Sequence, residues 1–207
     1  MNQINYQKSL ERVIDGLENR VPSLLLHSCC GPCSTYCIEY LSSFFNITVF
    51  YYNPNIYPDN EYLLRVKEQK AFIDAFPTRY PVSFLEGDFD KERFYEVTKG
   101  MENEPERGKR CEKCIGLRLT KTAQKASELG FDYFTTTLSV SPLKDACLIN
   151  SLGYDLENSK EISSKWLPCD FKKKSGYLRS CELSKEYNMY RQDYCGCVFS
   201  YNQRHNS

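Results

Sequence analysis

A short apolar run that ends abruptly in cysteines constrains the fold of this chain more than any other feature. Three leucines occupy residues 24–26, and the segment His27-Ser-Cys-Cys-Gly-Pro-Cys33 follows directly. The run is typical of a buried strand, and residues Ser34 to Phe45 are predicted to form a helix. The cysteines would therefore lie where a strand ends and a helix begins. In open α/β sheets this crevice binds ligands, and helix amino ends favour thiolates.

The same alternation of strand and helix continues along the first 150 residues. Further turns are indicated at Gly100–Arg110, a charged loop, and at Asp193–Cys197. The pattern predicts an α/β fold with a mostly parallel sheet flanked by helices on both faces, and a single domain spanning 1–207. Helices are predicted at Gln3–Asn19, Ser34–Phe45, Asp59–Ala75 with Asp59 or Asn60 as cap, Asp90–Lys99, Cys111–Leu129, Asp145–Leu152 and Gly176–Tyr187, and strands at 24–26, Ile47–Tyr52, Pro81–Leu85 and Tyr133–Thr137.

Charge and cysteine content narrow the classes of function. The 27 basic and 27 acidic residues cancel, so no global field draws the chain to nucleic acid or to a membrane surface. Residues 1–8 contain no apolar signal region, and no run approaches the roughly 20 apolar residues of a membrane helix. We therefore expect a cytoplasmic protein with no membrane partner. In that compartment, eleven cysteines indicate metal or redox chemistry rather than structural disulfides.

Two pairs of cysteines are each predicted at the start of a helix. Cys29 and Cys30 follow the first strand, and Cys111 and Cys114 are spaced so that both sulfurs share a helix face. Such junctions lie along one edge of a parallel sheet, so four thiolates could converge on zinc or an iron–sulfur cluster. The alternative is unrelated buried thiols, but spacing and placement favour the metal site. Cys33 is open to three interpretations: a further ligand, a ligand of a second metal, or a spare thiol.

A third group, Cys195-Gly-Cys197, lies near the end of the chain. Gly196 gives the backbone freedom to close a small and strained disulfide ring, which suits a pair that cycles between dithiol and disulfide. Two other interpretations stay open, namely additional metal ligands or a simple turn. The isolated cysteines are interpreted as packing residues: Cys37, Cys147, Cys169 and Cys181.

Local clusters of basic residues accompany both later cysteine groups. Phosphate contacts from them would make RNA binding salt-dependent, although ordinary solvated surface is the alternative. Three tyrosines, Tyr52, Tyr57 and Tyr62, are candidates for stacking on a base or for packing. The basic residues are Lys172, Lys173, Lys174, Arg179, Lys185 and Arg191 in one segment and Arg107, Lys109, Arg110 and Lys113 in the other.

Two families share motifs with this chain, and the first match is limited to four residues. Cys30-Gly-Pro-Cys33 resembles the redox motif of thioredoxins, which also follows a strand. Cys29 stands where thioredoxins usually carry Trp, and the other cysteine groups would have no role. A thioredoxin-type disulfide oxidoreductase is therefore kept only as an alternative function, beside a zinc-stabilised RNA-binding module without chemistry.

The second set of motifs runs in order along nearly the whole chain. These motifs resemble the cobalamin-independent epoxyqueuosine reductases (QueH), and their number makes the match specific. They are His27-Ser-Cys-Cys-Gly-Pro-Cys33, Tyr52-Asn-Pro-Asn-Ile56, Glu61-Tyr62 with Arg65, Arg110-Cys-Glu-Lys-Cys114, Arg118-Leu119, Phe131-Asp-Tyr-Phe-Thr-Thr-Thr137, Ser141-Pro-Leu-Lys144, Asp170-Phe-Lys-Lys-Lys174, Gly176-Tyr177, Arg179-Ser180, Leu183-Ser-Lys185 and Tyr190-Arg-Gln-Asp-Tyr-Cys-Gly-Cys197.

The resemblance implies a reaction, a fold and a set of site residues. The family reduces the epoxide of epoxyqueuosine in tRNA to queuosine, and its fold resembles the nucleotide-binding (HUP-type, PP-loop) sheets of tRNA-thiolating ATP pyrophosphatases. Their phosphate loop is replaced here by Ser28-Cys-Cys-Gly-Pro-Cys33, so no ATP use is expected. The resemblance implies a [4Fe–4S] cluster, a redox-active pair close to it in the C-terminal segment, an external electron donor, and room for an additional iron. The cluster ligands would be Cys29, Cys30, Cys111 and Cys114, and the redox pair Cys195 and Cys197. Asp193 lies close to that pair in the sequence and is a candidate proton donor or iron ligand, the alternative being an ordinary exposed carboxylate of a turn.

Overall fold

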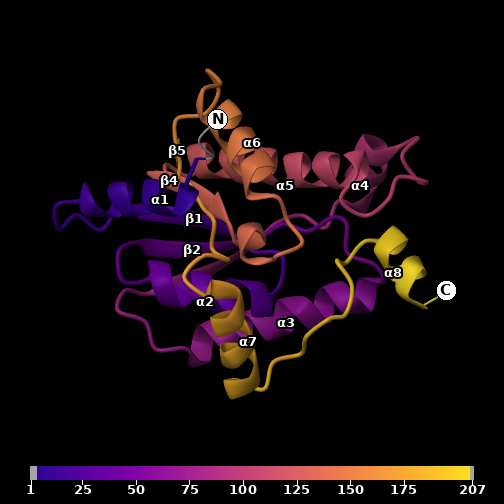
Figure 1. Cartoon of the computed structure of the whole chain (residues 1–207), viewed down its shortest axis with the longest axis horizontal. Helices are drawn as coiled ribbons and strands as arrows, with labels where there is room; N and C mark the ends of the chain where they lie inside the picture. The colour runs from indigo at the N-terminus through magenta and orange to yellow at the C-terminus, as the bar shows by residue number, and fades with distance from the viewer. Residues whose placement is uncertain (1–3, 206–207) are drawn as a thin grey trace.

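A five-stranded, entirely parallel sheet forms the centre of the molecule (Figure 1). The computed structural model describes residues 4–205, and the predicted helix start at Gln3 lies outside them. The strand order is β3-β2-β1-β4-β5, which confirms the predicted α/β fold. The strands are β1 (Ser23–His27), β2 (Asn46–Tyr51), β3 (Val82–Glu86), β4 (Tyr133–Thr136) and β5 (Lys165–Trp166).

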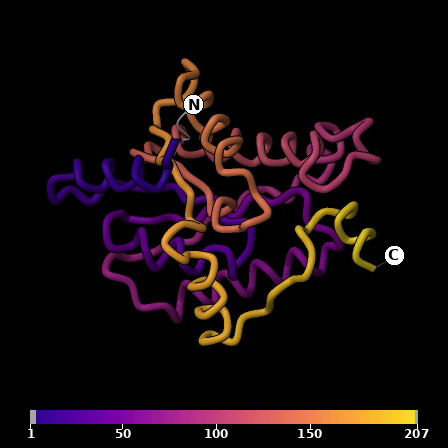
Figure 2. Tube along the Cα trace, viewed as in Figure 1, coloured from indigo at the N-terminus to yellow at the C-terminus, as the bar shows by residue number. Residues whose placement is uncertain are grey.

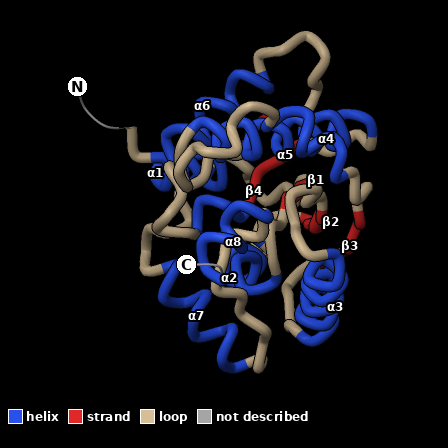
Figure 3. The backbone as a smooth tube through the Cα atoms, turned by 90° about the vertical axis from the view of Figure 1, so that its right-hand side faces the viewer, coloured by secondary structure: helices blue, strands red, loops and turns tan. Residues whose placement is uncertain are grey.

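Helices cover both faces of this sheet (Figure 3). The first two crossovers place α2 and α3 on one face, where α7 packs on α2, and the crossover into β4 places α5 on the other face with α4 and α6 beside it. The helices are α1 (Tyr6–Asp15), α2 (Gly31–Leu41), α3 (Asp59–Ala75), α4 (Lys91–Thr98), α5 (Lys109–Glu128), the 3₁₀ helix η1 (Thr137–Val140), α6 (Ala146–Glu157), α7 (Gly176–Glu186) and α8 (Val198–His205).

Several predicted boundaries are wrong, each for a local reason. Helix α2 begins at Gly31 and not at Ser34, because Pro32 fits the first helical turn, where its missing N–H costs nothing. Helix α3 has Pro58 as its N-cap, so neither Asp59 nor Asn60 caps it. Asp90 does cap α4, accepting a hydrogen bond from the Arg93 backbone over 3.2 Å. The strand predictions over 24–26 and Ile47–Tyr52 are confirmed within one or two residues.

The sheet reverses its winding at β1, and this reversal creates the crevice that holds the cysteines. Strand β1 pairs with β2 on one side and with β4 on the other, and all three leucines of 24–26 are fully buried. The chain leaves β1 into α2 on one face and leaves β4 through η1 toward α6 on the other (Figure 1). Ligands bind at such a switch point, beyond the carboxyl ends of the strands.

The C-terminal segment runs along α3 and ends beside the same edge of the sheet (Figure 2). The Tyr190 hydroxyl donates to Glu61 over 3.0 Å, and the Tyr57 N–H donates to the Gly196 carbonyl over 2.8 Å. These contacts bring residues 190–197 across the molecule to the carboxyl ends of the strands. Within residues 4–205, no helix has the length and apolar character needed to span a membrane.

Candidate functional site

Three thiols meet between β1 and α2. The sulfur atoms of Cys29, Cys30 and Cys33 lie within 4.8 Å of one another, and those of Cys29 and Cys30 are 3.9 Å apart. Cys30 is the N-cap residue of α2 and is buried, whereas the other two are half-buried. The structure therefore assigns Cys33, left open by the sequence, to the first thiol group.

A buried histidine fixes the turn that presents these thiols. Nδ1 of His27 lies 2.8 Å from the Thr136 hydroxyl, and Nε2 lies 3.2 Å from the Tyr52 carbonyl oxygen. A carbonyl can only accept, so Nε2 carries the proton and Nδ1 accepts from the hydroxyl. Burial, with Arg118 nearby, lowers the pKa of His27 to about 3. The neutral ring thus ties β1 to its two neighbouring strands directly before the cysteines.

The first thiol group is electrostatically asymmetric. Hydrogen bonds from Cys29 and Cys33, with the nearby Arg65, hold the pKa of Cys30 well below that of a free thiol. Arg65 is 2 % exposed and bonds Glu61 over 2.7 Å, but its Nη2 has no hydrogen-bond partner in the described part of the chain. The hydroxyl of Tyr51, next to Arg65, is also unpartnered. Two buried donors beside Cys30 are thus left free to bond a group held by the thiols.

The second thiol group begins α5. Cys111 and Cys114 line a narrow space of about 20 Å³ together with Cys195 and Cys197. The Cys111 sulfur accepts a hydrogen bond from the Arg107 backbone over 3.2 Å. Because α5 begins at Lys109, two residues earlier than predicted, both cysteines lie within its first two turns, on the same side. The structure therefore brings the second and third cysteine groups together.

In the Cys195-Gly196-Cys197 turn, Cys195 is partly exposed and Cys197 is buried. Gly196 has a φ of +121°, and a Cβ there would lie 3.1 Å from Arg65 Nη1, so glycine is required. Ser200 binds both ends of the turn, accepting from the Cys195 N–H over 3.1 Å and donating its N–H to the Cys197 sulfur over 3.4 Å. Burial raises the pKa of Cys197 to about 12. Cys195 is half-buried, and both residues are free thiols.

A larger cavity of about 300 Å³ adjoins the narrow space around Cys111 and Cys114, and the more exposed thiols of the first group face it. Cys29 and Cys33 line it, and three residues line both spaces: Arg118, Lys144 and Cys195. All the predicted site residues therefore lie at one edge of the sheet. Among residues 4–205, however, only the Cys29, Cys30 and Cys33 sulfurs form a tight group, so convergence of the four predicted ligands stays a prediction.

Two of the residues that line both cavities are cations, Arg118 and Lys144. Both belong to motifs given above, but the sequence predicted no function for either. Arg118 is 3 % exposed, and Lys144 donates its Nζ to the Cys195 sulfur over 3.3 Å. Burial opposes the charge of Arg118, but Cys114, Cys195 and Cys29 outweigh it and raise its pKa. Positive charge is thus concentrated where the thiols face one another.

Much of the predicted basic surface is neutralised by carboxylates. Lys172 pairs with Asp170 and Lys174 pairs with Glu11, while Arg179 contacts Glu39 over 2.6 Å. These pairs weaken the prediction that the 172–179 segment contacts RNA. The buried Arg110 is likewise unavailable, because its Nη1 bonds three backbone carbonyls.

The remaining candidates divide between packing and surface. Tyr52 and Tyr62 are buried, so of the three candidates Tyr57, which is 40 % exposed and has Tyr201 against its ring, is the one that a base could reach. Cys37 and Cys169 are core residues as predicted, whereas Cys147 is exposed, which corrects its interpretation as a packing residue. It lies in the first turn of α6, on the side of the helix that faces solvent.

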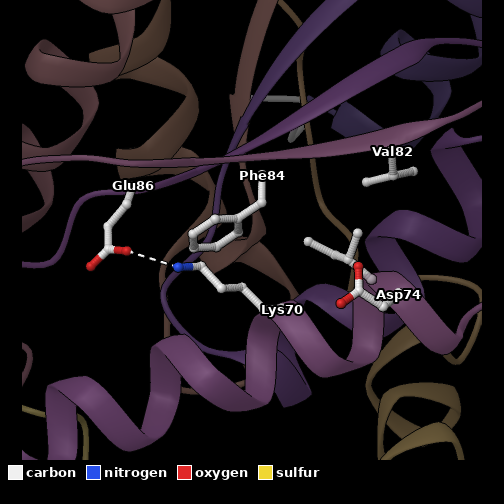
Figure 4. A pocket seen from close by; sticks show the side chains of 6 residues that line it. Lys70, Asp74, Val82, Phe84 and Glu86 are labelled. Atoms are coloured by element: carbon white, nitrogen blue, oxygen red, sulfur yellow. Dashed lines mark hydrogen bonds and ion pairs between the residues drawn. The ribbon is translucent and has the colours of Figure 1, made fainter.

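A separate hollow of about 480 Å³ lies between α3 and β3 (Figure 4). Among the residues that line it, Lys70 donates to Glu86 over 3.1 Å, and the Phe84 ring lies beside this bond, between the strand and the helix. It contains no thiol and none of the residues that the sequence predicts for the site. The chemistry-bearing residues therefore point to the cysteine-lined cavities and not to this hollow.

Comparison with known proteins agrees with the motifs. A family model described as "Epoxyqueuosine reductase QueH" matches residues 24–203. A protein of that name from Streptococcus pyogenes serotype M1 is 46% identical over 202 residues, which cover 96% of this chain and 78% of the relative. One from Staphylococcus epidermidis is 44% identical, with 96% and 85% covered. One from Thermotoga maritima is 34% identical, with 88% and 92% covered.

Proposed function

The chain belongs to the epoxyqueuosine reductase QueH family, and on that basis we propose that it reduces the epoxide of epoxyqueuosine in tRNA to the alkene of queuosine, the last step of queuosine biosynthesis. As a member of this family it is an oxidoreductase. One observation supports placing this reaction at the cysteine-lined cavities. Thiols from three distant segments line two adjoining cavities that share Arg118, Lys144 and Cys195. The larger cavity, about 300 Å³, is at the lower end of the range for small-molecule sites.

The proposed cofactor is a [4Fe–4S] cluster held by Cys29, Cys30, Cys111 and Cys114. Thiolates are the ligands that such clusters need, and the free N–H of Arg65 and the hydroxyl of Tyr51 near Cys30 suit hydrogen bonds to cluster sulfur. The residues present therefore fit the group. When bound, it would supply one-electron transfer, which no amino-acid side chain offers. Cys33, in the same thiol group, is the remaining sulfur for an additional iron.

The proposed reduction has a simple balance of electrons and protons. Converting an epoxide to an alkene consumes two electrons and two protons and releases the oxygen as water. The Cys195 and Cys197 thiols supply that number when they become a disulfide. An external electron donor would then return the disulfide to the dithiol state. Lys144 would hold Cys195 toward the larger cavity through its 3.3 Å contact, and Cys197 would stay on the buried side.

The deciding experiment begins with anaerobic purification and with iron and sulfide analysis. The protein is then incubated with tRNA that carries epoxyqueuosine and with a chemical reductant. We expect a brown protein that forms queuosine over many turnovers. The Cys195→Ser variant should keep its iron but lose multiple turnovers, whereas Cys147→Ser, which changes an exposed thiol on α6, should match the wild type.

Three results would contradict this proposal. A colourless protein that contains zinc and no sulfide would favour a zinc-stabilised RNA-binding module. Unimpaired turnover by Cys195→Ser would remove the role of the terminal pair. Disulfide reduction that needs only Cys30 and Cys33, without metal, would favour a thioredoxin-type oxidoreductase.

A further inference from the structure

Arg118 is a buried cation that lacks an acidic partner. Among residues 4–205, no carboxylate lies within 4.0 Å of its guanidinium, although Glu106 and Asp193 line the same cavity. The comparable Arg65, 2 % exposed, has Glu61 at 2.7 Å. Holding an unpaired charge away from water is energetically costly, so a buried arginine indicates that a negative group belongs beside it.

The hydrogen bonds of Arg118 hold it against the proposed cluster ligands. Its Nε donates to the backbone carbonyl of Cys114 over 3.2 Å, and its Nη1 donates to the Asn53 side-chain oxygen over 3.5 Å. The side chain therefore folds back along the first turns of α5. It forms part of the wall that separates the space around Cys111 and Cys114 from the cavity that contains Cys29 and Cys33.

Sulfur surrounds the guanidinium on both sides of this wall. The side chains that line the two spaces with it include six thiols: Cys29, Cys33, Cys111, Cys114, Cys195 and Cys197. A thiol that binds iron is deprotonated, so metal loading would place several negative charges around this one arginine. The other shared cation, Lys144, already contacts Cys195. Of the two cations that line both spaces, Arg118 is therefore the one whose charge faces the ligand thiolates without being held by Cys195.

We propose that Arg118 is the counter-ion of the iron–sulfur centre and that its charge raises the reduction potential of that centre. This inference rests on the function proposed above. Reduction adds a negative charge to the centre, and a nearby buried cation stabilises the reduced state more than the oxidised state because the local dielectric is low. The net charge around a cluster is one of the factors that set its potential. Arg118 acts here as a positioning and electrostatic residue.

The test compares two substitutions of Arg118 with a matched control on the same helix. Arg118→Gln removes the charge, Arg118→Lys keeps it, and Lys121→Gln removes a charge that is 37 % exposed and pairs with Asp88. Each anaerobic, iron-loaded protein is titrated with reductant at known ambient potentials and followed by absorbance. At a fixed potential, we expect the reduced-to-oxidised ratio of Arg118→Gln to fall at least tenfold, which is about 59 mV for one electron. Arg118→Lys should stay within about threefold of wild type, and Lys121→Gln should not differ from it.

If Arg118→Gln does not bind the cluster, its potential cannot be measured, and the iron content of the two variants tests the proposal instead. Full iron in Arg118→Lys with loss in Arg118→Gln would support the counter-ion role, because charge is the property that the lysine preserves. Equal loss of iron from both variants would overturn it, since a structural role predicts that result. An unchanged potential in Arg118→Gln would also overturn it, and a raised KM for tRNA in that case would assign Arg118 to a substrate anion. Wild-type protein without iron would refute the proposed function itself.

Discussion

Lys144 and Cys195, 51 residues apart in the chain, are joined by a hydrogen bond of 3.3 Å from Nζ to Sγ. The bond connects the loop after η1 with the C-terminal turn, across the cavity that the two residues line. The contact holds a positive charge against the sulfur atom at the wall of the cavity. Cys197, two residues away, lies on the buried side of the turn, and burial raises its pKa to about 12.

This contact predicts that removing the Lys144 charge makes Cys195 less reactive. In Lys144→Met, alkylation of Cys195 by iodoacetamide at neutral pH should slow about tenfold, equivalent to about 1.4 kcal/mol, whereas Lys144→Arg should retain most of the rate. Peptide mass spectrometry measures the rate for each cysteine separately. The exposed Cys147 in the same molecule serves as the internal control, and its rate should not change. Equal Cys195 rates in Lys144→Met and wild type would contradict the prediction.

A second prediction concerns pH and the pairing of β1 with β4. Asp132 accepts two hydrogen bonds of 2.8 Å from the backbone and hydroxyl of Ser23, and these bonds lower its pKa. The stabilisation is therefore complete above the carboxyl's ordinary pKa of about 3.9 and is lost as the pH falls through the lower folded value.

Asp132→Ala should accordingly reduce the free energy of unfolding by about 1 kcal/mol at pH 7, a modest loss because the carboxylate is exposed. The difference from wild type should shrink as the pH is lowered toward 2. Asp132→Asn, which keeps an acceptor without the charge, should lie between the two and vary less with pH. Urea unfolding at several pH values provides the measurement, and a difference independent of pH would argue against the charge.

Two glycines in helices predict opposite effects of the same substitution. In α6, a Cβ on Gly153 would lie 2.2 Å from the Trp166 ring, so Gly153→Ala should overpack the contact with β5 and destabilise by about 1–3 kcal/mol. In α5, no atom of residues 4–205 lies within 4 Å of a Cβ on Gly116, so Gly116→Ala should stabilise by up to about 1 kcal/mol through helix propensity. Thermal unfolding under anaerobic conditions compares them. A lower Tm for both would show that Gly116 has a constraint beyond its helix.

Helices and strands could be predicted from the sequence where the local pattern of apolar residues is strong and agrees with the fold. Three leucines before a cysteine turn mark β1, and helices alternating with apolar runs mark a parallel sheet. Helix α8 escaped prediction because it packs through aromatic contacts, such as Tyr201 against Tyr57 at 5.5 Å, without an apolar stripe. Strand β5 has two residues, too few to show any period.

The candidate site likewise has a part that the sequence predicted and a part that it did not. Cysteine spacing is visible in the sequence, and the structure places all three groups at one edge. The role of a basic residue depends on its burial and partners, which are distant: Glu39, which neutralises Arg179, is 140 residues away from it. For this reason the sequence overstated the 172–179 basic segment and gave Arg118 and Lys144 no function.

The corrected distribution of charge yields a final prediction about tRNA. Arg191 lines the larger cavity and bonds the Ser184 hydroxyl over 3.3 Å, and no carboxylate within residues 4–205 pairs with it, so its charge stays available for a phosphate. Arg179, in contrast, is held by Glu39 and Glu182. Arg191→Ala should weaken tRNA binding and reduce the slope of log K against log salt concentration by about 0.7–0.9, the value for one phosphate contact. Arg179→Ala is the matched control and should leave the slope unchanged, because its charge is already neutralised. Filter binding at four or more salt concentrations gives both slopes, and equal slopes for the two variants would exclude a phosphate contact from Arg191.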